Sequence, residues 1–232
     1  MNLREIILAG VFLTISIVTG VFQELNRHQE ILDFFAYDKT MRHKLVQNMR
    51  EQEKFLNIKY KNIPELKYLI PRELGKNRRF FCGYYNQEKN IIYYNSEIEM
   101  CGPDETLRHE VAHSYIIKKC LENKTCKNYR ESTDDEFKMV ISNLMNEGIA
   151  EYFDRGLKNK KTEFTDEELP EELEDFKFVI YDAGYHLVKP IIDEFRGKGV
   201  DYLIQNPPTP EELFNLPAYR ERILEELNDF YD

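Results

Sequence analysis

The chain has 232 residues, enough for one substantial hydrophobic core that can be divided into two lobes around a cleft. Hydrophobic residues make up 42% of it and aromatic residues 13%, which is typical of a folded globular protein. Its 42 acidic residues outnumber its 32 basic residues and give a formal net charge of −10. Because a nucleic-acid-binding surface must neutralise phosphates, nucleic acid is not an expected partner.

The N-terminal segment, residues 1–23, is apolar. No charged residue lies between Ile6 and Gln23, and Arg4 precedes the run. A stretch of this length can span a bilayer, and a basic start is typical of export. We expect an uncleaved membrane anchor or a cleaved signal peptide, with a buried core helix as the third alternative. An anchor or a signal peptide places the rest of the chain outside the cytoplasm, either tethered to the membrane or secreted.

The next segment, residues 24–58, is predicted to form a long polar helix. Apolar side chains recur in it at near-helical spacing, at Leu25, Ile31, Leu32, Phe35, Met41, Leu45 and Met49. Such a stripe indicates a helix that packs on the body of the protein. Residues 59–232 then form the main domain.

The pattern of the main domain changes along the chain from strands to helices. Residues 80–85 and 91–95 are rich in β-prone side chains and flank a polar turn, which predicts a hairpin. Helices are predicted from Pro103, from the Ser132–Asp135 cap to about Asp154, and from about Leu173 to Phe195 with a kink at Pro190. This order predicts an α+β fold with a small antiparallel sheet and a mainly helical C-terminal lobe.

The strongest chemical signal is the sequence His109-Glu110-Val111-Ala112-His113. On a helix, His109 and His113 lie one turn apart on the same face, so both imidazoles can reach one metal ion. Glu110 is rotated away from them and can reach a water molecule on that ion. Uncharged neighbours favour a helix buried at the floor of a cleft.

A third metal ligand is expected, because catalytic zinc usually has three protein ligands and a water. Asn146-Glu147-Gly148-Ile149-Ala150-Glu151 supplies a candidate, with 33 residues between His113 and Glu147. Glu147 and Glu151 lie on one helix face. Glu147 can bind the metal while Glu151 accepts a hydrogen bond from a ligand histidine. Gly148 would allow this helix to approach the histidine helix closely.

Together, His109-Glu110-x-x-His113 and Asn146-Glu147-Gly148-x-Ala150 resemble the gluzincin metallopeptidases, the clan of the thermolysin-like enzymes and the alanyl and leucyl aminopeptidases. The resemblance covers roughly residues 80–188. It implies a zinc cofactor held by His109, His113 and Glu147, with Glu110 as the general base and Glu151 as the acidic partner of a ligand. It also implies that an edge strand binds the substrate backbone, and the candidates are Ile91, Ile92, Tyr93 and Tyr94.

The aminopeptidase branch uses a tyrosine in Tyr-x-x-Gly to stabilise the oxyanion, and Tyr181-Asp182-Ala183-Gly184 is similar to that pattern. His186 is the alternative donor. The chain departs from the clan in its long gap before Glu147 and in lacking the Gly-Ala-Met-Glu-Asn element that binds a free amine.

These features predict a zinc-dependent peptidase, more consistent with an endopeptidase than an aminopeptidase, that acts on peptide or protein substrates. The alternatives are an exported, membrane-tethered zinc-binding module without turnover, a zinc hydrolase of another amide or ester, and an accidental motif in a structural domain.

Four cysteines follow the apolar segment. We expect Cys82–Cys101 and Cys120–Cys126 disulfides, in line with an oxidising compartment, with buried thiols as the alternative.

Overall fold

The computed structural model describes residues 38–68, 82–95, 102–123, 136–156 and 163–231. The chain divides into two compact units, Met1–His43 and Lys44–Asp232. Only residues 38–43 of the first unit are described, and they begin a helix that extends over residues 38–56. The predicted apolar segment 1–23 and the polar helix before residue 38 lie outside the described residues. Within the described part of the chain, none of the helices combines the length and the apolar character that a membrane span requires.

The second unit is mainly helical with one small sheet, which agrees with an α+β class. The sheet contains β1 (Glu65–Tyr68), β2 (Gly83–Asn86) and β3 (Ile91–Tyr94), in the order β1-β3-β2. The predicted hairpin is confirmed, because β2 pairs antiparallel to β3. The prediction of a purely antiparallel sheet is wrong, because β1 pairs parallel to β3 and makes the sheet mixed.

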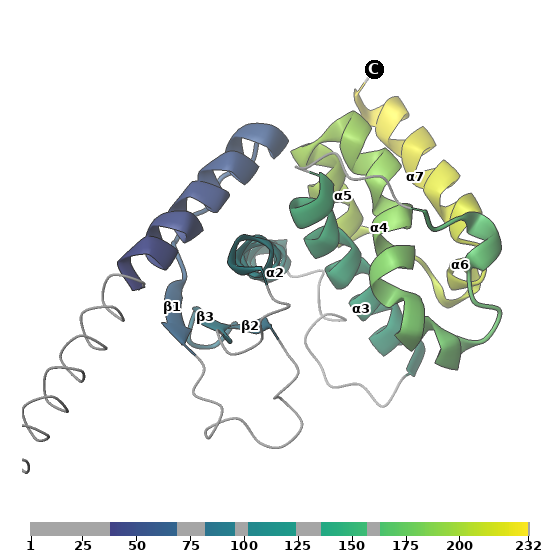
Figure 1. Ribbon diagram of the computed structural model, residues 1–232. Helices are drawn as coiled ribbons and strands as arrows, with labels where there is room; N and C mark the ends of the chain where they lie inside the picture. The colour runs from purple at the N-terminus through teal and green to yellow at the C-terminus, as the bar shows by residue number, and fades with distance from the viewer. Residues whose placement is uncertain (1–37, 69–81, 96–101, 124–135, 157–162, 232) are drawn as a thin grey trace, which may run out of the picture. The chain divides into compact units, whose positions relative to one another are not determined.

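Helix α2 (Pro103–Asn123) carries the histidine motif and lies between the sheet and the other helices (Figure 1). It begins at a proline followed by two acidic residues, which suit the positive end of a helix dipole. The helix at residues 38–56 is fastened to it by two buried amides. Asn48 donates a hydrogen bond to the carbonyl oxygen of Asp104 over 3.4 Å, and Gln52 donates one to that of Arg108 over 3.1 Å. Leu45 and Met49 of the predicted stripe are buried.

The C-terminal lobe packs its helices around a shared apolar core. Its α-helices are α3 (Glu136–Glu151), α4 (Phe176–Phe195), α5 (Gly197–Gln205), α6 (Pro210–Leu213) and α7 (Leu216–Tyr231). A π-helical turn, Tyr152–Gly156, extends α3, and two 3₁₀ turns, Asp166–Glu168 and Leu173–Asp175, precede α4. Pro190 lies inside α4 as predicted. Helix α4 ends at Phe195, as predicted, and Arg196, whose φ is 55°, separates it from α5.

The cysteines only partly follow the expected pairing. Cys82 is disulfide-bonded, and its partner lies outside the described residues. Cys120 is a buried thiol in α2, so the predicted Cys120–Cys126 disulfide is wrong.

The closest helix contact in the lobe joins α3 to α4 at two glycines. A Cβ on Gly148 would lie 2.5 Å from the carbonyl carbon of Gly184, and a Cβ on Gly184 would lie 2.5 Å from the carbonyl oxygen of Leu144. The helices therefore touch backbone to backbone. The prediction that Gly148 allows a close approach to the histidine helix is wrong, because Gly148 contacts the backbone of Gly184 in α4. Because Glu147 precedes Gly148, this contact also fixes the position of Glu147.

We expect Gly148→Ala to lower the free energy of unfolding by about 1–3 kcal/mol, because the added methyl group collides with backbone that cannot move aside. In an ordinary helix the same change stabilises by roughly 0.5–1 kcal/mol. Denaturant unfolding measures the difference, with Asn143→Ala on the exposed face of α3 as the control. A stabilised Gly148→Ala variant would contradict the close helix contact.

Candidate metal centre

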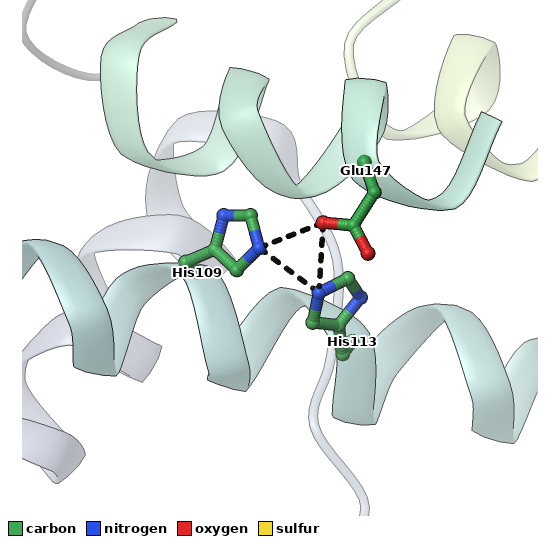
Figure 2. Close-up of side chains that lie close together, drawn as sticks. All are labelled: His109, His113 and Glu147. Atoms are coloured by element: carbon green, nitrogen blue, oxygen red, sulfur yellow. Dashed lines mark hydrogen bonds and ion pairs between the residues drawn. The ribbon is translucent and has the colours of Figure 1, made fainter. Parts of the chain in front are cut away.

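Two imidazoles of α2 meet at the face of the helix that points to α3. His109 and His113 are one turn apart, and their Nε2 atoms lie 3.0 Å from each other. Figure 2 shows both rings turned towards the same point, as the helical spacing predicted. His113 is 9% exposed, so this face of α2 is closed by the helices that pack on it.

Glu147 of α3 completes the group from the facing helix (Figure 2). Its Oε2 atom lies 3.0 Å from Nε2 of His109 and 3.5 Å from Nε2 of His113. One ligand atom from each of the three side chains falls within 4.8 Å of the other two. Two imidazole nitrogens and one carboxylate oxygen form a donor set suited to a divalent transition metal. The side chains therefore fit a metal ion, and they would hold it through these atoms.

The other ring nitrogen of each histidine faces an oxygen. Nδ1 of His109 lies 3.3 Å from Oε1 of Glu151, and Nδ1 of His113 lies 3.1 Å from Oδ1 of Asn146. An oxygen acceptor at Nδ1 favours the tautomer that leaves a lone pair on Nε2, which is the atom a metal requires. The structure thus places Glu151 where the sequence predicted it. Asn146 was missed as a partner, although it directly precedes Glu147 in the motif.

The cluster is strongly coupled electrostatically. Burial lowers the pKa of His109, but the hydrogen bonds to Glu147 and Glu151 outweigh burial and raise that pKa to about 10. Burial raises the pKa of Glu147, yet the neighbouring His113 and His109 lower it well below its usual range. Positive charge at the centre of the three side chains is therefore stabilised, and a divalent cation would supply it.

Glu110 is buried beside this centre and is aligned by β2. A Cβ on Gly83 would lie 2.8 Å from Cγ2 of Thr106 and 3.3 Å from Cγ of Glu110, so only glycine allows the strand to lie this close to α2. The backbone N–H of Tyr85 donates a hydrogen bond to the Glu110 carboxylate. Burial raises the pKa of Glu110, and the two histidines only partly offset that effect. A carboxyl group in such surroundings is suited to accept and release a proton.

A pocket of about 300 Å³ opens beside Glu110. Its walls are Cys82, Gly83, Glu105, Thr106, His109, Glu110, Glu151, Asp154 and Tyr181. The pocket joins the edge of β2, the face of α2 and the beginning of α4. It gives a ligand access to the Glu110 carboxylate.

Tyr181 and His186, the two predicted oxyanion donors, lie in different places. Tyr181 lines the pocket, with its ring centroid 6.2 Å from that of His109. Burial and the nearby Glu147 raise its pKa to about 12, so the hydroxyl keeps its proton. His186 instead places Nε2 2.7 Å from Asp166 and contacts Phe164. The prediction for His186 is wrong, because five residues along a helix turn it by about 140° from Tyr181.

The strand predicted to bind substrate is also misplaced. Ile91, Ile92, Tyr93 and Tyr94 form β3, which is paired on both sides and is therefore not an edge. Among the described residues, the edge next to the pocket belongs to β2. The carbonyl oxygen of Cys82 accepts a hydrogen bond from Asn95, so in the alternating antiparallel pattern the peptide groups of Gly83 and Tyr85 face away from β3.

Two arginines that sequence reasoning missed brace the site. Nε of Arg108 lies 3.3 Å from Oδ1 of Asp154 in the pocket wall. Arg155 forms ion pairs with Glu151 and with Asp182, and so connects the carboxylate at His109 to the residue after Tyr181. The spacing of Glu151 and Arg155, four residues apart on a helix, was a usable signal.

Comparisons of the chain with protein-family models, with curated proteins and with solved structures found no match. The geometry of the site is therefore the basis for proposing a function.

Proposed function

We propose that this chain is a zinc-dependent peptidase in which Glu110 is the general base. The observation that carries the proposal is the position of Glu110: it is buried next to His109, accepts a hydrogen bond from β2, and lines a pocket beside three side chains suited to bind a metal.

His109, His113 and Glu147 would hold the zinc ion. When bound, zinc supplies Lewis acidity that polarises a carbonyl group and lowers the pKa of a water molecule. Glu110 takes the proton of the attacking water and later delivers it to the leaving amine. Its raised pKa supports the first step, since a stronger base accepts the proton more readily. The Tyr181 hydroxyl donates a hydrogen bond to the developing oxyanion.

The edge of β2 is the proposed binding strand for the substrate. Gly83 presents a peptide N–H and C=O away from β3 and lines the pocket, so an extended peptide can add to the sheet there. Main-chain hydrogen bonds would align the scissile bond with Glu110 irrespective of side-chain sequence. The absence of the amine-binding Gly-Ala-Met-Glu-Asn sequence favours internal cleavage, and hence an endopeptidase.

We also propose that the enzyme acts outside the cytoplasm, anchored or released by its N-terminal segment. The disulfide of Cys82 supports this location, because disulfides persist mainly in oxidising compartments. The substrate would then be an exported peptide or protein.

Glu110→Gln is expected to reduce peptide cleavage by about 10²–10⁴-fold, because the amide cannot accept the proton of the water. Zinc content is expected to stay equal to that of the wild type, since Glu110 is not one of the three ligands. The measurement is the cleavage of unfolded protein and mixed peptides, followed by mass spectrometry, with both proteins adjusted to the same zinc content.

Equal cleavage by the two proteins would refute Glu110 as the base. No cleavage by the wild type with zinc bound would refute the peptidase and favour a zinc-binding module or a hydrolase of another bond.

The variants Tyr181→Phe and His186→Ala distinguish a role in catalysis from a role in stability for each residue. Loss of the Tyr181 hydroxyl is expected to lower kcat by about 10²–10³-fold, as for other oxyanion donors. His186→Ala removes the contacts to Asp166 and Phe164, and is expected to lower the melting temperature while kcat stays within about twofold. Steady-state kinetics and thermal unfolding of both variants make the comparison; a large kcat loss in His186→Ala alone would reverse the assignment.

A further inference from the structure

A second cavity of about 320 Å³ shares no lining residue with the pocket at Glu110. It is formed by the loop that follows the helix at residues 38–56, by the C-terminal half of α2, by the start of α5 and by the end of α7. A concave site of this size is typical of those that enclose a small organic molecule. The proposed peptidase mechanism makes no use of it.

The lining of this cavity is positively charged, whereas the whole chain has a negative net charge. Five lysines surround it: Lys59, Lys61, Lys118, Lys119 and Lys198. Among the described residues, the lining contains two carboxylates, those of Glu122 and Asp201. The cavity thus carries three more positive than negative charges, in a chain whose formal net charge is −10. We refer to it as the lysine cavity.

Two of the lysines are neutralised within the lining, and the others are not. Lys61 lies 2.7 Å from Glu122, and Lys119 lies 2.8 Å from Asp201. Lys118 is half-buried and donates a hydrogen bond to the carbonyl oxygen of Asn62 over 3.2 Å. Burial lowers the pKa of Lys118, and the charge of the nearby Glu122 partly offsets that effect.

The remaining two lysines stand at the rim. Lys59 is exposed and has no carboxylate partner among the described residues. The ammonium group of Lys198 lies 3.7 Å from the ring centroid of Tyr231, which holds it over an aromatic face.

The floor of the lysine cavity is apolar and firmly held. Ile58 and Tyr115 are buried, and the Tyr115 hydroxyl donates a hydrogen bond to Asp201 over 2.8 Å. The Tyr115 ring packs edge-on against Tyr60 at a centroid distance of 5.6 Å. Since Ile58 and Tyr115 are almost fully covered, the aromatic surface that a ligand can reach is the partly exposed ring of Tyr60, which also lines the cavity.

We propose that the lysine cavity binds a small organic anion that carries at least two negative charges on one group and a ring or similar apolar part. The anionic group lies among Lys59, Lys118 and Lys198, whose charge the lining leaves unbalanced. The apolar part rests against the ring of Tyr60. Charge-assisted hydrogen bonds supply most of the affinity, and the aromatic floor distinguishes this ligand from inorganic anions.

The test is a calorimetric titration of the full chain with phenyl phosphate, which combines a dianion with a ring. The cavity variant carries two changes in the lysine cavity, Lys59→Gln and Lys198→Gln. The matched control is Lys54→Gln with Lys89→Gln, two exposed lysines outside the cavity, which changes the net charge equally. We expect the cavity variant to bind phenyl phosphate at least about tenfold more weakly than the wild type. The affinity of the control is expected to stay within about twofold of the wild type.

Inorganic phosphate and benzoate form two further arms, each offering one half of the ligand. Both are expected to bind at least about tenfold more weakly than phenyl phosphate. Equal binding of inorganic phosphate would overturn the role of the aromatic floor. No binding of phenyl phosphate at millimolar concentration, or an equal loss in the control variant, would overturn the site. Unchanged binding in the cavity variant would also overturn the site, because the ligand would then lie elsewhere, for example at the metal centre.

Discussion

The site is governed by the contact between one carboxylate of α3 and two imidazoles of α2. Glu147, His109 and His113 bring three polar side chains together in a largely buried space, where unpaired polar groups are costly. They are stable there because each has partners: Glu151 and Asn146 hold the outer ring nitrogens, and positive charge at the centre is favoured. Such an arrangement could hold a cation.

Much of the remaining fold serves to keep α2 and α3 in register. On one side of α2, the amides of Asn48 and Gln52 bond to its carbonyl oxygens. On the other side of α3, Gly148 and Gly184 let α4 pack backbone to backbone, and α4 brings Tyr181 to the pocket. The sheet contributes Gly83, whose missing side chain leaves room for the base. Small displacements in any of these contacts would move a ligand atom or the base.

The features that were predictable from the sequence depend on local spacing. His109, Glu110 and His113 follow from helical periodicity, and Glu151 follows from its position one turn after Glu147. The hairpin follows from two β-prone runs around a polar turn. Family resemblance suggested Glu147 and Tyr181, and the structure brings both to the site.

The errors concern pairings between distant parts of the chain. β1 joins β3 in parallel, and no local pattern revealed that a strand at residues 65–68 would occupy the expected edge. His186 is close to Tyr181 in the sequence, which suggested the same role for both. The direction of its side chain on α4 decides its contacts instead. The lysine cavity could not be predicted from the sequence, because its lysines come from three separate segments and the net charge of the chain is negative.

The central claim is that one metal ion is held between α2 and α3 by His109, His113 and Glu147. Equilibrium dialysis against zinc, followed by measurement of zinc per chain, tests it most directly in the wild type, Glu147→Ala and Glu110→Gln. We expect one zinc per chain in the wild type and in Glu110→Gln, and loss of binding in Glu147→Ala because catalytic zinc usually has three protein ligands. Zinc retained by Glu147→Ala with unchanged affinity would contradict it.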